Sequence, residues 1–195
     1  HYQAALQINP AFSDARFNLG VALAGQGQMD KALSHYQEAL KINPDLSEAH
    51  HNLGVALVDR GRIDEAIEHL EKSLHISPQD AQFHHSLGRA LVEQGMIDEA
   101  IEHLERSLKI DPKNATVYYN LGGALAVRER MSEAAENYQN ALKIDPDFYE
   151  AHNNLGVVLV QQGAVEEAII HFSKALSIDP SYRTAQENLD RVQPK

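Results

Sequence analysis

The chain has 195 residues, with 17 Lys and Arg against 28 Asp and Glu, a net charge of −11 at pH 7, and no cysteine. The acidic balance argues against nucleic acid as a partner, because such binding depends on neutralising phosphates. The lack of cysteine excludes disulfides and zinc–thiolate sites, and no apolar run approaches the ~20 residues needed for insertion across a membrane.

A proline recurs every 34 residues, and this period predicts a stack of repeated helical hairpins rather than a single packed core. The series comprises Pro10, Pro44, Pro78, Pro112, Pro146 and Pro180. In register with it, a Leu-Gly pair, an alanine, and an aromatic residue or leucine recur in five blocks. In chain order, the expected elements are residues 1–12, 13–46, 47–80, 81–114, 115–148, 149–182 and 183–195.

Residues 47–80 show how one block forms two helices. In the first half, Leu53 and Leu57 fall on one stripe at helical spacing, and Gly61 ends that helix. We expect Asp64 to cap the second helix, whose own apolar stripe follows it. The proline at the end of the block then breaks the second helix and returns the chain for the next pair.

Two columns of residues set further expectations about the backbone. Gly54 and Ala66 are small, as required where the two helices of a block approach closely. Glycine ends the first helix in four of the five full blocks, but the fourth block has Glu129 at that position. A left-handed backbone there would cost a side chain ~1 kcal/mol or more. This predicts faster amide exchange in residues 127–132 than in residues 59–64.

These columns resemble the tetratricopeptide repeat, and the resemblance covers the whole chain. It implies an all-α fold, an α-solenoid in which helix-turn-helix units wind into a right-handed superhelix. The five full blocks would each be one repeat. Residues 1–12 would be the tail of a preceding second helix, and residues 183–195 a capping first helix with Asp190 at the glycine position.

A second stripe on each first helix points away from the core. In tetratricopeptide repeats this side lines a concave groove in which peptides lie. The first column of candidate binding residues is Phe17, His51, His85 and Tyr119. The second column is Asn18, Asn52, Asn120, Asn154 and Asn188, and the third is Val21, Val55, Arg89 and Val157.

The asparagine column is the most specific functional signal. A carboxamide places a donor beside an acceptor, so it can bond the backbone of an extended peptide regardless of its side chains. Helices ~8–10 Å apart would meet such a peptide at about every third residue. The column resembles the asparagine ladder of O-GlcNAc transferases, as does the run at 151–156, although Ser86 interrupts it. The alternative is a structural role, in which each amide bonds a neighbouring helix.

The charges of the groove indicate a ligand that is neutral to basic and partly apolar. Within the five full repeats, Arg89 is the only groove cation, whereas Asp14, Glu48 and Glu150 lie at the rim. The carboxylate clamp that some tetratricopeptide repeats use for acidic tails needs several cations on this face, so we do not expect such a tail.

The sequence predicts no catalytic site, no metal site and no cofactor. Its eleven histidines fall in columns, and Glu–His pairs such as Glu65 and His69 supply only two metal ligands each. His85 and Ser86 are adjacent and diverge around the helix, so they do not form a nucleophile–base pair. We therefore expect packing histidines and no enzyme in this segment.

The predicted function is a protein–protein interaction scaffold that binds a protein or peptide segment in the groove. Two alternatives stay open: the substrate-recognition arm of a larger glycosyltransferase-like protein, and a self-assembling oligomeric scaffold. The chain opens with His1 inside a helix, which indicates a fragment of a longer array. We expect a cytoplasmic location, with the soluble part of a membrane-attached protein as an alternative. The stripe Tyr2, Ala5 and Leu6 predicts fraying, or a weak homodimer through this open end.

Overall fold

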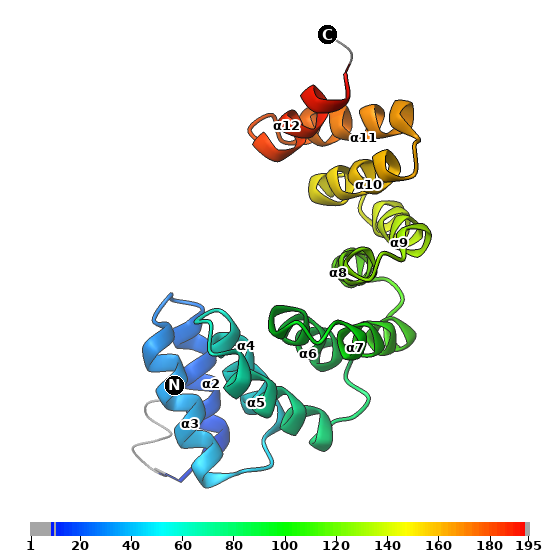
Figure 1. The fold of residues 1–195 in the computed structure, drawn as a ribbon. Coiled ribbons are helices and arrows are strands. Elements are labelled where there is room, and N and C mark those ends of the chain that lie inside the picture. The colour runs from blue at the N-terminus through cyan, green and yellow to red at the C-terminus, as the bar shows by residue number, and fades with distance from the viewer. Residues whose placement is uncertain (1–8, 10, 194–195) are drawn as a thin grey trace. The chain divides into compact units, whose positions relative to one another are not determined.

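The computed structural model describes residue 9 and residues 11–193. The fold is all-α, as predicted: this part of the chain contains eleven helices, labelled α2–α12, and no β-strand (Figure 1). None of these helices combines the length and the apolar composition needed to cross a bilayer. The helices form two compact units, residues 1–96 and 97–195.

Each unit is a stack of antiparallel helical hairpins. The first unit contains α2 (Ser13–Ala24), α3 (Met29–Ile42), α4 (Ser47–Val58), α5 (Ile63–Ile76) and α6 (Ala81–Gln94). The second contains α7 (Ile97–Ile110), α8 (Ala115–Val127), α9 (Met131–Ile144), α10 (Tyr149–Gln161), α11 (Val165–Ile178) and α12 (Arg183–Val192). The most extensive contacts join α2 to α3, α4 to α5, α8 to α9, and α10 to α11. Each hairpin then packs on the next helix along the chain, which is the arrangement of a solenoid.

The glycine of a Leu-Gly pair lies against the aromatic residue or leucine on the second helix of the same repeat. A Cβ atom built on Gly54 would lie 2.7 Å from Cγ of Leu70 and 3.1 Å from the carbonyl oxygen of Ala66. In the preceding hairpin, a Cβ on Gly20 would lie 2.7 Å from Cε1 of Tyr36. The prediction that small residues mark a close helix approach is therefore confirmed, because a side chain at either glycine would collide with the second helix.

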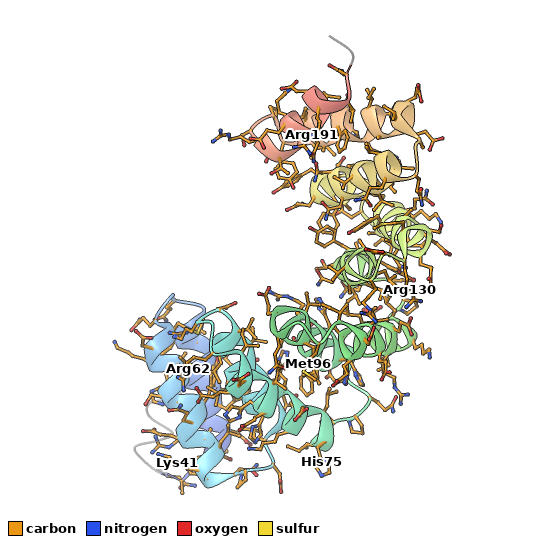
Figure 2. All side chains as sticks on the ribbon, in the orientation of Figure 1. Lys41, Arg62, His75, Met96, Arg130 and Arg191 are labelled. Atoms are coloured by element: carbon orange, nitrogen blue, oxygen red, sulfur yellow. The ribbon has the colours of Figure 1, made fainter. Side chains whose placement is uncertain are left out.

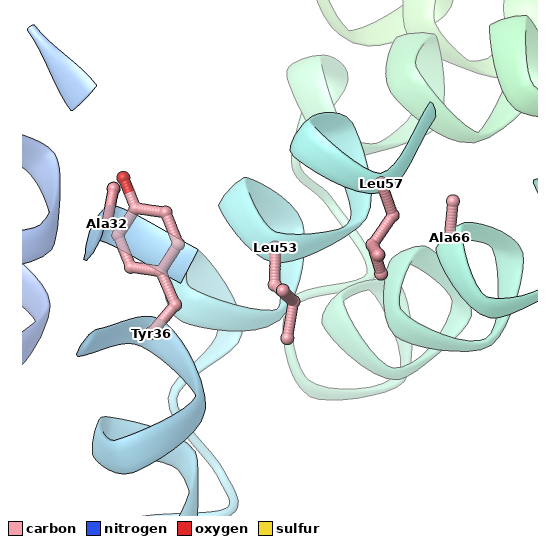
Figure 3. Packing of buried hydrophobic residues seen from close by; sticks show 5 residues of the cluster. All are labelled: Ala32, Tyr36, Leu53, Leu57 and Ala66. Carbon is pink, nitrogen blue, oxygen red and sulfur yellow. The ribbon is translucent and has the colours of Figure 1, made fainter. Parts of the chain in front are cut away.

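The core runs from one hairpin to the next inside the first unit. Figure 3 shows Tyr36 and Ala32 of α3 beside Leu53 and Leu57 of α4, with Ala66 of α5 on the other side of α4. All five side chains are 3% exposed or less. Burial of about 25 cal/mol for each Å² of apolar surface makes this shared core the main stabilising contribution.

The turn between the two helices of a repeat uses the left-handed backbone that the sequence predicts. The glycines at this position have φ angles of 73° at Gly27, 70° at Gly61, 84° at Gly95 and 81° at Gly163. Glu129 occupies the same conformation with φ of 58°, and it is the one non-glycine residue with positive φ in the described part of the chain. The conformational part of the prediction is confirmed, and the difference in amide exchange remains a prediction.

The predicted cap of α5 is wrong. The helix begins at Ile63, its N-cap is Arg62, and no side chain caps it. Asp64 already lies in the first helical turn, where its charge complements the helix dipole. Its Oδ1 accepts a hydrogen bond of 2.7 Å from Nε2 of Gln94 on α6, so its role is to link successive repeats.

The two ends of the chain are described to different extents. Of the expected element 1–12, only residues 9, 11 and 12 are described, so Tyr2, Ala5 and Leu6 lie outside the described residues, and the fraying and homodimer stay predictions. At the other end α12 lies within the expected capping element, and Asp190 is exposed on it.

Candidate functional site

In the first unit, one hollow gathers most of the candidate residues of α2, α4 and α6. It has a volume of about 310 Å³, and we call it the first-unit groove. Its lining includes six predicted residues, Val21, His51, Asn52, Val55, His85 and Arg89. It also includes Met29 and Gln82, which the sequence reasoning missed. Gln82 could have been found, because it stands 34 residues after Glu48, a residue placed at the rim.

The lining of the first-unit groove is mostly apolar, with a few polar side chains among the apolar ones. Val21 is 42% exposed, and Val55 is half-buried, so both offer apolar surface. Arg89 and Asp59 are exposed and bring one positive and one negative charge to the lining. Phe17, the remaining aromatic candidate of this unit, packs beside Tyr36 with a ring-centroid distance of 5.8 Å. The arrangement suits a partly apolar segment rather than a string of like charges.

The two histidines of the first column are buried in the wall of this groove. His51 is 9% exposed, and its ring stacks on Phe83 at a centroid distance of 4.6 Å. His85 is 8% exposed; its burial, helped by the nearby charge of Arg89, lowers its pKa to about 4. A histidine with so low a pKa is neutral at pH 7, so neither its charge nor much of its surface is offered to a ligand.

A hydrogen bond between repeats explains the serine that interrupts the asparagine column. Nδ1 of His51 lies 3.2 Å from Oδ1 of Asn52, an acceptor, so this nitrogen carries the proton of the neutral ring. Nε2 of His51 is then an acceptor, and it lies 2.8 Å from the hydroxyl oxygen of Ser86 on α6. The hydroxyl of Ser86 donates this bond, which links two successive first helices.

In the second unit, the asparagines form a chain of hydrogen bonds across α12, α10 and α8. Nδ2 of Asn188 donates to Oδ1 of Asn153 at 2.9 Å, and Nδ2 of Asn153 donates to Oδ1 of Asn154 at 3.1 Å. Nδ2 of Asn154 then donates to the hydroxyl of Tyr119 at 3.2 Å. Burial raises the pKa of Tyr138, on α9, to about 12, and a hydrogen bond with Asn154 opposes the shift. The structural role that the sequence left as an alternative is therefore present for these amides.

The asparagine side chains nevertheless reach the surface. Asn18, Asn52, Asn120, Asn154 and Asn188 are all partly exposed, whereas the neighbouring Asn153 is buried. A carboxamide has two N–H donors and two acceptor lone pairs, so one bond to a neighbouring repeat does not exhaust it. Val157 and Asn188 also line a hollow of about 180 Å³ in the second unit, together with Arg191 of α12 (Figure 2).

Two other kinds of site come into question from the sequence, a metal site and a serine–histidine pair. Among the described residues, no group of three or more His, Asp or Glu side chains is placed to hold a metal ion. His85 and Ser86 lie side by side on α6, and the hydroxyl of Ser86 bonds His51 of the preceding repeat instead. Ser86 is thus occupied in packing between repeats.

Family models for the tetratricopeptide repeat match most of the chain. Models described as "Tetratricopeptide repeat" match residues 1–34, 23–90 and 149–182, and one described as "TPR repeat" matches residues 88–126 and 128–163. The chain belongs to the tetratricopeptide repeat family. No curated protein sequence matches it at a significant level.

Solved structures of other repeat proteins share the fold. YrrB, described as "a TPR protein with an unusual peptide-binding site", is 22% identical, with a TM-score of 0.81 over 95% of this chain and 96% of its own. MamA is 28% identical, with a TM-score of 0.76 over 84% of this chain and 96% of its own. PilF of Pseudomonas aeruginosa is 18% identical, with a TM-score of 0.85 over 97% and 86% of the two chains. Tetratricopeptide solenoids are typical of non-catalytic interaction scaffolds.

Proposed function

We propose that this tetratricopeptide chain is a scaffold that binds an extended protein segment along its first helices. The observation that carries the proposal is the first-unit groove, which brings the apolar Val21 and Val55 together with the amide of Asn52. A mostly apolar lining with a few polar groups is the usual composition of a ligand site. The similarity of fold to YrrB, which is described as having a peptide-binding site, supports the same use here.

The preferred ligand is neutral to basic and presents an aliphatic or aromatic side chain to Val21 and Val55. Arg89 and Asp59 balance each other in the groove lining, whereas the whole chain has a net charge of −11. His51 and His85 contribute shape rather than charge, because burial lowers the pKa of each ring. In this proposal the asparagines have two roles: they bond the neighbouring repeat, and they present a remaining polar group to the ligand backbone.

The first alternative, a substrate-recognition arm, would use the same groove, and the second, self-assembly, would use other surfaces. A glycosyltransferase-like arm needs the asparagine column to hold a substrate segment, so it makes the same prediction for the groove. Self-assembly would instead leave peptide affinity independent of Asn52 and Val55, and the stripe it was predicted to use lies outside the described residues.

A display experiment tests the proposal without knowledge of the natural partner. Peptides are selected from a random library on the immobilised chain, and the best binder is synthesised for fluorescence anisotropy. Changing Asn52, Asn120 and Asn154 together to Ala should weaken its binding about tenfold or more, since each lost hydrogen bond is worth ~0.5–1.5 kcal/mol. A separate Val55→Ser variant should weaken it as well.

Two matched variants serve as controls. Asn137→Ala removes an asparagine that bonds the carbonyl of Glu133 within α9, and Ile170→Ser removes a side chain of α11 that is 66% exposed. Both should bind like the unchanged chain. Circular dichroism establishes that every variant is folded. Unchanged affinity in both the triple asparagine variant and Val55→Ser would show that the asparagine column and the first-unit groove do not bind the peptide.

A further inference from the structure

In each unit, a pair of histidines joins the two helices of a repeat. In the first unit, Nδ1 of His50 on α4 lies 2.8 Å from Nδ1 of His69 on α5. In the second, Nδ1 of His152 on α10 lies 2.9 Å from Nδ1 of His171 on α11. The ring centroids are 5.1 and 5.2 Å apart, with interplanar angles of 34° and 32°. The same geometry thus recurs in both units.

The position of the proton in each pair follows from a third group, a backbone carbonyl. Nε2 of His50 lies 3.0 Å from the carbonyl oxygen of Pro44, which can only accept, so this nitrogen carries a proton. In a neutral ring Nδ1 of His50 then has the lone pair, and Nδ1–H of His69 must be the donor. The carbonyl of Pro146, 3.1 Å from Nε2 of His152, fixes the second pair in the same way.

This arrangement has room for one additional proton but not for two. A first proton can bind Nε2 of His69, which leaves its Nδ1–H donating to His50. A second proton would have to bind Nδ1 of His50, where an N–H of His69 already points at it from 2.8 Å. Two facing N–H groups repel each other and cannot form a hydrogen bond. The doubly protonated pair must therefore separate.

We propose that each histidine pair is a one-proton clasp, which holds hairpins α4–α5 and α10–α11 closed at neutral pH and opens when a second proton binds in mild acid. The clasp residues are well covered: His50 is 7% exposed, His152 is 9% exposed, and their partners are half-buried. Opening would therefore separate the two helices locally rather than only turn a surface ring.

The charged groups around the first pair do not offset its burial. Asp45, in the loop before α4, raises the pKa of His50, and Glu65 and Glu68 of α5 raise that of His69. Lys72 lowers both, and burial, the largest effect, leaves both pKa values below the ordinary range. In the described chain, no charged group of α3 or α6 is among those that shift either value.

The second pair has the same balance. Lys174 lowers the pKa of His152 and Asp147 raises it, while Glu167 raises that of His171. Burial again dominates and leaves both pKa values lowered, and no charged group of α9 or α12 in the described chain contributes. Because the folded pairs bind protons less readily than the unfolded chain, both hairpins lose stability as the pH falls below the ordinary histidine pKa of about 6.5.

Amide exchange as a function of pH tests the clasp one unit at a time. In the unchanged chain, the exchange of α4–α5 and of α10–α11, corrected for its intrinsic pH dependence, should rise about tenfold between pH 7 and pH 5. His69→Gln should reduce this rise in α4–α5 to the part that the buried His51 of α4 contributes, and leave the rise in α10–α11 unchanged. A glutamine side chain can donate to neutral His50 and accept from protonated His50, so it keeps a bond in both states.

The control is His75→Gln, which removes an exposed histidine near the C-terminal end of the same helix α5 (Figure 2). It should leave both responses unchanged. Long-range ¹⁵N–¹H spectra at pH 8 should show His50 and His152 protonated at Nε2, and His69 and His171 at Nδ1. The proposal is overturned if these tautomers are reversed. It is equally overturned if α4–α5 keeps its full pH response in His69→Gln, or if both imidazoles become protonated without faster exchange.

Discussion

Replacing Glu129 with Gly should stabilise the second unit, because this residue alone among its equivalents carries a side chain in a left-handed turn. Its φ of 58° matches the 70–84° of the glycines in the other four turns. A left-handed backbone costs a residue with a Cβ roughly 1–2 kcal/mol. Glycine loses ~0.5–1 kcal/mol more backbone entropy on folding, which offsets part of the gain. The net stabilisation expected is therefore about 0.5–1 kcal/mol.

The reverse substitution provides the matched control. A Cβ added at Gly61 would meet no atom within 4 Å, so Gly61→Glu should cost a similar amount through backbone conformation alone. The turn hydrogen bonds are alike in both repeats: the amide of Arg62 bonds the carbonyl of Leu57 at 3.0 Å, and that of Arg130 bonds Leu125 at 2.9 Å.

Urea unfolding followed by circular dichroism, together with amide exchange, measures both variants. In the unchanged chain, residues 127–132 should exchange faster than residues 59–64, and Glu129→Gly should slow the faster segment. Gly61→Glu should accelerate exchange in 59–64. Equal protection of the two turns in the unchanged chain, or a Glu129→Gly variant that is no more stable, would refute the argument from backbone conformation.

Two further predictions concern packing and pH. Gly54→Ala should destabilise the first unit by about 1–3 kcal/mol, because the new Cβ would lie 2.7 Å from Cγ of Leu70. Gly25→Ala, whose Cβ would have 3.7 Å to its nearest neighbours, should be close to neutral; equal thermal midpoints for the two variants would contradict this. His85 has its pKa lowered to about 4, so the folded chain stays neutral there while the unfolded chain takes up a proton. Stability should therefore fall by up to about 3 kcal/mol between pH 6.5 and pH 4, and His85→Gln should flatten this part of the profile in urea unfolding. A parallel profile in that variant would exclude His85 as a source of the loss.

The sequence by itself determined the repeat, the helical hairpins and the close approach of the two helices at the glycine of the Leu-Gly pair. Gly54 and Leu70 are close together in the sequence, and helical periodicity fixes the direction in which each points from its own helix. The glycine column likewise indicated a left-handed turn, because few other residues adopt positive φ without cost, and Glu129 adopts it as predicted. These features depend on local geometry, which is the same in every repeat.

Only the tertiary structure decided which side chains meet across two helices, either within a hairpin or between successive repeats. The periodicity placed His51 on the groove side but could not show that Phe83 of the next repeat covers its ring. It placed Asp64 near a helix start but not beside Gln94, 30 residues later. It also assigned His50 and His69 to separate columns, and the structure brings their Nδ1 atoms to 2.8 Å. Periodicity gives the angle of a side chain around its own helix, whereas these contacts depend on the rotation and separation of two helices, which the packing of the whole core sets.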